Sequence, residues 1–200
     1  MSKESEKCYN IYIQDFIFEI IIIKAVLILM FKVGSYVSYR SEGVCIISDI
    51  RKENFGTVGK DTLYYVLSPV GDAKSTFFVP VDNDTLVAMM RKILSADEVV
   101  ELITQVSKRP DEWISDSKAR GLYFKKVLGD GERDELVFLI HNIKKNIDAQ
   151  TNLGKKPYVS DINTIDRAAK LLLGEFSMTM PISTTDEVIE FIEKIYSENR

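Results

Sequence analysis

Side chains that commonly perform chemistry are few in this sequence. It has one histidine, His141, and two cysteines, Cys8 and Cys45, which lie far apart. Catalytic triads and histidine-containing metal sites need several such residues, so the composition argues against both. The cysteine spacing gives no disulfide framework or zinc motif and fits a reducing cytoplasm. Phosphate-binding glycine loops and nucleophile elbows are also missing from the sequence. We therefore predict a protein that is not an enzyme, with no catalytic residues, metal, cofactor or small-molecule substrate; a carboxylate pair is the one catalytic option left open.

The charge of the chain limits how it can meet nucleic acid. Lys and Arg number 26 and Asp and Glu number 30, which gives a net charge of −4. A protein that binds DNA by itself is usually basic overall, so any DNA contact here must be local or supported by a partner. Residues 102–170 hold 13 basic and 10 acidic side chains, whereas residues 171–200 hold 2 and 6. We expect the acidic C-terminal segment to face away from DNA.

The chain after residue 29 divides into two segments with different sequence patterns, one typical of strands and one typical of helices. Residues 30–93 contain short runs rich in β-branched and aromatic residues, separated by turn residues such as Gly56 and Gly59. This pattern predicts a small curled sheet or SH3-like barrel. Period-two spacing suggests that the core-facing side chains are Val44, Ile46, Tyr64 and Val66. Pro80, between Val79 and Val81, predicts an edge strand or a bulge, and an edge strand can recruit a partner strand.

Residues 94–200 have the periodicity of helices. Ser95 and Glu98 form a capping-box pattern at the start of a helix over 95–107. Further helices are predicted over 111–129, 132–150, 160–180 and 184–196, and His141 is expected at the border of an apolar helix face in a structural role. Lys144, Lys145, Lys155 and Lys156 are interpreted as solvated surface, with phosphate contact as the alternative. The predicted fold class is α+β, a small β-barrel followed by an all-α helical domain.

The first thirty residues are the least typical part of the chain. Residues 11–31 are strongly apolar but contain Asp15, Glu19 and Lys24, and no uncharged run approaches the roughly 20 residues of a membrane span. Nothing resembles a signal-peptide cleavage site. Three interpretations stay open: a membrane or partner-binding helix, an extra element packed on the domain, or translation that begins at Met30, which would make 1–29 an extension.

The segment that starts at Met30 resembles the opening of CarD-type transcription regulators, which reads approximately M-F-K-x-G-D-x-V-x-Y-P-x-x-G-V-x-x-I-x-x-I. The matching residues are Phe31, Lys32, Gly34, Val37, Tyr39, Gly43, Val44 and Ile50. Two later segments resemble the family's Y-Y-V-L and M-x-V-P-V-D through Tyr64, Tyr65, Val66, Leu67, Val79, Pro80, Val81 and Asp82. The sequence departs from the pattern at Ser35, where Asp is usual, at Arg40, where Pro is usual, and at Phe78, where some members carry Arg.

The resemblance implies a function in transcription. In this family, and in transcription-repair coupling factor, the first domain is Tudor-like and binds the β subunit of RNA polymerase, so we expect a strand of this domain to extend a sheet there. The expected polymerase-binding residues are Phe77, Phe78, Val79 and Pro80.

A weaker resemblance continues in the helical segment, through Trp113, the turn at Gly129 and Asp130, and the LLLGEF string with Leu172, Gly174 and Glu175. In the family this tryptophan wedges into the minor groove beside the melted promoter, where a flat apolar side chain can fill an unstacked step. The DNA-binding residues implied for this chain are Trp113, Lys118, Arg120, Lys125 and Lys126. Base-specific readout is not expected, because no helix bears a cluster of Arg, Asn and Gln.

The interpretation is therefore a cytoplasmic transcription regulator with three segments: 1–29 of doubtful status, 30–93 for polymerase binding and 94–200 for polymerase-assisted contact with promoter DNA. The alternative is an SH3-like protein-protein adapter without DNA binding, associated with a membrane through residues 11–31. Trp113 discriminates between them, because the wedge requires an accessible ring beside Lys118 or Arg120, and a ring buried between helices would defeat it.

Overall fold

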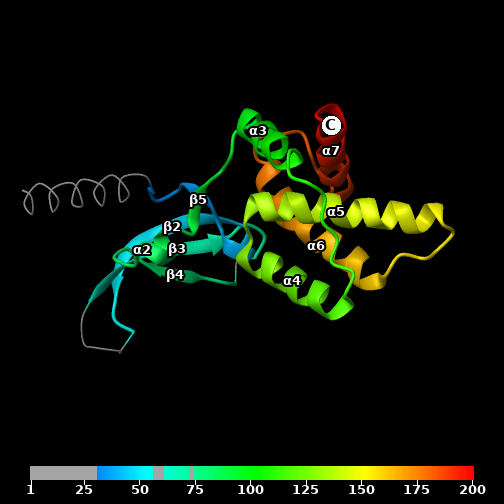
Figure 1. Ribbon diagram of the computed structural model, residues 1–200. Coiled ribbons are helices and arrows are strands. Elements are labelled where there is room, and N and C mark those ends of the chain that lie inside the picture. The colour runs from blue at the N-terminus through cyan, green and yellow to red at the C-terminus, as the bar shows by residue number, and fades with distance from the viewer. Residues whose placement is uncertain (1–30, 56–60, 73) are drawn as a thin grey trace, which may run out of the picture.

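A computed structural model describes residues 31–55, 61–72 and 74–200, and they form an α+β fold (Figure 1). The strands are β1 (Tyr36–Tyr39), β2 (Val44–Glu53), β3 (Thr62–Pro69), β4 (Phe77–Pro80) and β5 (Met90–Lys92), accompanied by the 3-10 turn η1 (Arg40–Glu42) and the short helix α2 (Asp84–Val87). They make one antiparallel sheet in the order β4-β3-β2-β1-β5. The expected closed barrel is not observed, because β4 and β5 lie at opposite ends of the sheet and do not pair.

Five longer helices follow the sheet. They are α3 (Ala96–Ser107), α4 (Ser117–Asp130), α5 (Arg133–Asn152), α6 (Val159–Phe176) and α7 (Thr185–Glu198). The predicted capping box at Ser95 and Glu98 is confirmed, since each side chain accepts the other residue's backbone N–H. The helix expected over 111–129 begins only at Ser117. Asp116 is its N-cap and accepts the Ala119 N–H, so the preceding residues belong to a loop.

The sheet and the helices each bury an apolar cluster of their own. In the sheet, the cluster contains the alternate set, Cys45, Ile47, Tyr65 and Leu67. Two of the four residues predicted to face the core, Val44 and Val66, are buried outside this cluster, whereas Ile46 and Tyr64 are only partly buried. Both sets are largely apolar in these strands, so period-two spacing alone cannot choose the face. In the helical cluster, α5 buries these apolar residues, among others: Leu136, Leu139, Ile140 and Ile143.

The end of α4 approaches the strands in Figure 1, and the contact is made with η1. Gly131 has φ 66°, and a Cβ there would come within 2.5 Å of the Arg40 carbonyl oxygen. Arg91 of β5 reaches the same point, where its guanidinium donates to the Gly131 carbonyl at 2.6 Å and to the Glu132 carboxylate at 2.6 Å. Backbone contact and ionic contact therefore join sheet and helices at one place.

A second set of hydrogen bonds connects the C-terminal end of β5 to the helices α5 and α6. Glu175, which is 2% exposed, accepts Arg133 Nε at 2.8 Å and the Leu94 N–H at 3.0 Å. Arg133 also donates to the Lys92 carbonyl at 2.6 Å. The glutamate of the LLLGEF string thus ties the end of the sheet to α5 and α6. The β5 end of the sheet is consequently engaged by the helices, whereas β4 forms the opposite edge.

Several predictions fall outside the described residues. They concern Cys8, the segment 1–29 with its three interpretations, the start at Met30 and the turn at Gly56 and Gly59. Phe31 is described and packs edge-on against Tyr65, with ring centroids 6.0 Å apart. Of the helices in residues 31–55, 61–72 and 74–200, none is both long and apolar enough to cross a membrane.

Candidate functional site

Strand β4 offers a backbone edge. Among the described strands it pairs with β3 alone, and the proline that predicted an edge position lies at its end. The Val81 N–H donates to the Leu63 carbonyl at 2.9 Å. Because hydrogen-bonded pairs alternate along an antiparallel ladder, the backbone N–H and carbonyl of Phe78 point toward the open edge. Pro80 contributes only a carbonyl there. The edge can therefore accept a short partner strand centred on Phe78.

The side chains of β4 divide between two faces. Val79 is fully buried, and Phe77 packs on the sheet core, where its ring centroid lies 6.5 Å from that of Tyr39. Phe78 and Pro80 point to the opposite face. Of the four predicted polymerase-binding residues, these two present side chains outward, while Phe77 and Val79 support the strand from inside.

Three aromatic rings gather on that outward face, and we call them the aromatic cluster: Phe55, Tyr64 and Phe78. Their centroids are 5.0 Å apart for Phe55 and Phe78, and 5.3 Å for Phe55 and Tyr64, in edge-to-face geometry. Phe55 is 57% exposed, and the Arg51 guanidinium lies 5.8 Å from the Phe78 centroid. Tyr64 and Phe78 are partly exposed, and aromatic residues with an arginine are enriched in protein-binding hot spots. Sequence reasoning missed Phe55 and Tyr64 because they come from other segments.

Trp113 lies in the loop before α4 and is half-buried against the helical core. Hydrogen bonds fix the loop on both sides of it. The Glu112 N–H donates to Asn142 Oδ1 at 2.9 Å, and Arg120 Nη1 donates to the carbonyls of Ile114 and Ser115 at 2.9 and 3.3 Å. The ring also borders a cavity of about 270 Å³ between the loop and α5. Trp113 is therefore held in place without being enclosed.

Arg120 is buried, with 6% of its surface exposed. Its guanidinium carbon lies 4.8 Å from the Trp113 ring and 5.8 Å from the Tyr158 ring. Its Nε lies 3.7 Å from the carboxylate of Asp161, which is also buried. The prediction of Arg120 as a surface ligand of DNA does not fit this position. Its charge is used inside the protein, where it supports the Trp113 loop.

The three predicted lysines of α4 do lie on the surface. Lys118, Lys125 and Lys126 are exposed, and the exposed side chain of Leu122 lies on the same helix. By contrast, Lys144 and Lys145 are paired with Asp148 and Asp111. The lysines without an ion-pair partner among the described residues thus follow α4, the helix that runs from the Trp113 loop to the sheet.

An ionic network fixes the segment that leads into the Trp113 loop. Asp111 receives hydrogen bonds from Lys145 and Arg200, and His141 Nε2 lies 3.2 Å from it. Burial alone would raise the pKa of Asp111, but these bonds and the charge of Arg200 outweigh it and lower the pKa to about 2. The carboxylate stays ionised at neutral pH, and the network weakens only as the pH falls toward that value. His141, stacked on Tyr196, has the structural position that was expected.

The family comparison concerns the sheet. A model described as the CarD-like/TRCF RID domain matches residues 31–94. Residues 31–94 form a RID domain. The match runs from the first described residue through β5, so it contains the whole sheet, including the β4 edge. It supports an RNA polymerase-interacting role, and it ends before α3. No curated protein matches the chain.

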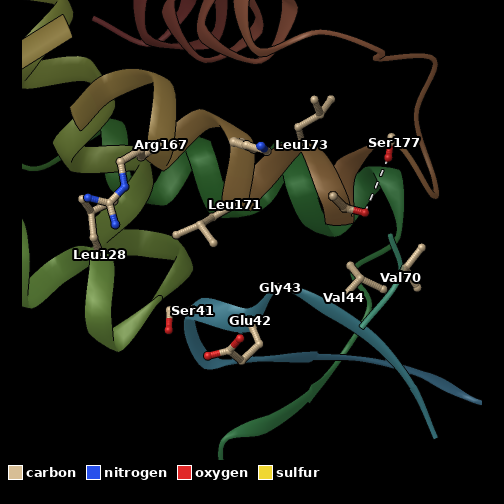
Figure 2. A pocket seen from close by; sticks show the side chains of 12 residues that line it. Ser41, Glu42, Gly43, Val44, Val70, Leu128, Arg167, Leu171, Leu173 and Ser177 are labelled. Atoms are coloured by element: carbon tan, nitrogen blue, oxygen red, sulfur yellow. Dashed lines mark hydrogen bonds between the residues drawn. The ribbon is translucent and has the colours of Figure 1, made fainter. Parts of the chain in front are cut away.

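A groove of about 630 Å³ lies between the RID domain and α6 (Figure 2). The RID domain contributes Ser41, Glu42 and Val44, and Arg167 and Leu171 line the α6 side. The one acidic side chain of the lining, Glu42, lies on the RID wall, and the two basic ones, Arg167 and Lys170, lie on the α6 wall. Among the described residues, no group of histidine, cysteine and carboxylate side chains could hold a metal ion.

Proposed function

We propose that the protein is a transcription regulator that docks on the β subunit of RNA polymerase through its RID domain and stabilises the open promoter through weak DNA contact by its helices. The observation that carries the proposal is the RID domain match together with the open β4 edge. Polymerase is a cytoplasmic partner, and no sequence-specific readout is required.

The docking step uses backbone and side chains together. A strand of the polymerase would pair with β4 at Phe78, where one N–H and two carbonyls face the edge. The aromatic cluster would then cover the side chains of that strand, and Arg51 would add a charge next to the rings. The helices that follow the sheet are bonded to it at the β5 end. A partner strand can therefore approach the β4 edge without meeting them.

Replacing Phe78 with alanine is expected to weaken binding to the polymerase β subunit about tenfold or more, since a central aromatic anchor carries much of an interface's energy. Binding is measured by biolayer interferometry with the purified bacterial β subunit. Val70→Ala is the control, because Val70 is an exposed apolar residue of the same domain, at 60%. Unchanged affinity for Phe78→Ala would rule out this face, and no binding by the wild-type chain would rule out the transcription role.

Trp113 and Arg120 have different roles in DNA contact. The half-buried indole keeps one side toward the protein, and its remaining surface is available to pack on an unstacked base step. Arg120 holds the loop and the ring from behind, while the phosphate contacts fall to Lys118, Lys125 and Lys126. Because few lysines contact phosphates, the affinity of the helices for DNA is low unless polymerase holds the promoter next to them.

Replacing Trp113 with alanine is expected to shorten the lifetime of the open promoter complex roughly tenfold, because re-stacking of the base step is no longer blocked. Affinity for the β subunit should not change. The measurement is the decay of heparin-challenged open complexes formed by RNA polymerase holoenzyme, with Trp113→Phe as a variant that retains an aromatic ring.

One alternative gains support from the partial burial of Trp113. If the ring serves only the helical core, the protein is an adapter that binds polymerase without touching DNA. Open complexes would then decay at the same rate with wild-type protein and with Trp113→Ala, provided that both variants are folded and bind the β subunit.

A further inference from the structure

The turn between α5 and α6 exposes apolar and basic side chains together. We call the following residues the α6 tip: Leu153, Lys155, Lys156, Tyr158 and Val159. Its three apolar members are exposed by 71%, 59% and 71%, in chain order. Ile162, one turn into α6, is exposed as well. Such a group of large apolar side chains on a surface marks a contact site more often than isolated ones do.

The backbone holds the tip in a defined shape. The Lys155 N–H donates to the Gln150 carbonyl and the Gly154 N–H to the Thr151 carbonyl, each at 2.9 Å. Gly154 has φ 69°, so α5 ends in a Schellman motif, which fixes the direction of the chain. Tyr158 then begins α6 as its N-cap residue. The exposed side chains are therefore presented by a structured turn.

Tyr158 and Trp113 both lie next to the buried Arg120, although they are 45 positions apart in the sequence. Their ring centroids lie 5.8 and 4.8 Å from the same guanidinium carbon of Arg120. Arg120 is anchored to Asp161 in the first turn of α6, so one buried ion pair connects the Trp113 loop to the α6 tip. Two aromatic side chains thus flank one buried cation, and Tyr158 is the more exposed of the two.

Charge around the two rings favours a polyanion. Lys155 and Lys156 lie just before Pro157 and Tyr158 in the sequence, Lys118 lies in the first turn of α4, and all three are exposed. Among the described residues, none of the ion pairs engages these lysines. Glu112 and Asp116 are the exposed acids nearby in the chain, and Asp116 is occupied in capping α4. The basic line continues along α4 through Lys125 and Lys126, which suits an elongated anion better than a flat membrane surface.

We propose that the α6 tip is a second nucleic-acid contact, in which Tyr158 stacks on an unpaired base next to the Trp113 site while Lys155 and Lys156 contact the flanking phosphates. The inference rests on the proposed function, because it takes partly melted promoter DNA as the occupant. Stacking on aromatic side chains is tolerant of sequence, so this contact would add affinity for opened DNA without base-specific readout.

The test uses the full chain with RNA polymerase holoenzyme on a promoter that carries 2-aminopurine at the first unpaired upstream base. Tyr158→Ala is expected to shorten the open-complex lifetime about tenfold and to raise 2-aminopurine fluorescence, because a stacking partner is lost. Tyr158→Phe should retain both values. Tyr36→Ala is the matched control, since Tyr36 is an exposed tyrosine of the RID domain, at 45%. Thermal unfolding verifies that each variant is folded.

The outcomes separate this inference from the proposed function. A shorter lifetime with Trp113→Ala but no change in lifetime or fluorescence with Tyr158→Ala would overturn the second contact alone. If neither variant changes the lifetime, the DNA role itself fails. Binding of the chain to phosphatidylserine vesicles that is lost in Tyr158→Ala, with no fluorescence change on promoter DNA, would also overturn the proposal, because a membrane would then be the occupant.

Discussion

Replacing Arg120 with methionine is expected to lower the free energy of unfolding by about 3–5 kcal/mol, the usual cost of removing one partner of a buried ion pair. Asp161 is 1% exposed, and its carboxylate would lose its cationic partner. Its Oδ2 has no hydrogen-bond partner among the described residues. The carbonyls of Ile114 and Ser115 would also lose their donor. A loss of this size is a large fraction of the stability of a typical domain.

The double variant Arg120→Met with Asp161→Leu distinguishes the cost of a stranded charge from the loss of packing. Because apolar replacements of both partners are often nearly neutral, we expect the double variant to regain most of the stability. Urea unfolding followed by circular dichroism measures all three proteins. A loss below about 1 kcal/mol for Arg120→Met would show that the pair is not a significant support of the Trp113 loop.

Replacing Gly131 with alanine should open the junction between the RID domain and α4. The left-handed conformation that Gly131 adopts costs a residue other than glycine about 1–2 kcal/mol of stability. The added Cβ would also meet the Arg40 carbonyl at 2.5 Å, and backbone cannot move aside as a flexible side chain can. Overpacking of this kind costs about 1–3 kcal/mol more. Hydrogen exchange should rise in η1 and in the last turn of α4.

Gly129→Ala provides the control for this prediction. Gly129 lies two residues earlier in α4, has no heavy atom within 4 Å of an added Cβ and does not adopt positive φ. Alanine there should stabilise the helix by about 0.5–1 kcal/mol. Opposite signs for the two variants would identify the contact with Arg40 as the cause, and equal stability would refute the close approach.

The edge position of β4 could be predicted because one residue decides it. A proline cannot donate to a central ladder, so Pro80 restricts its strand to an edge. The prediction from the sequence did not separate the inward side chains of Phe77 and Val79 from the outward ones of Phe78 and Pro80. The aromatic cluster could not be predicted, because Phe55, Tyr64 and Phe78 meet only through the pairing registers of β2, β3 and β4.

The helical site was harder to predict, for two physical reasons. The acidic residues Asp111 and Glu112 resemble a helix start, but Asp116 caps α4 instead, and the Ser-Asp-Ser run at 115–117 was the better signal. Arg120 was expected to contact DNA because it lies close to Lys118, in the stretch where the resemblance implies basic residues; an arginine is rarely buried without a partner. Its partner, Asp161, lies 41 residues away in another helix, which no local pattern reveals.

Arg40 departs from the proline usual in the family at this position, and its φ is 48°. A proline ring fixes φ near −65°, so it could not adopt this conformation. The departure and the contact with Gly131 therefore belong to one local arrangement of the backbone.

The position of Trp113 gives the protein a built-in optical reporter. It is the chain's only tryptophan, so all indole emission arises from the loop that is proposed to meet DNA. A guanidinium lies over the ring and part of the ring faces solvent, so its emission should respond when a base or a lipid replaces water. The RID domain contributes no indole among its residues, and docking on β4 should be optically silent. Once the emission of the polymerase's own tryptophans is subtracted, stopped-flow fluorescence of this indole can therefore time the DNA event separately from the arrival of polymerase.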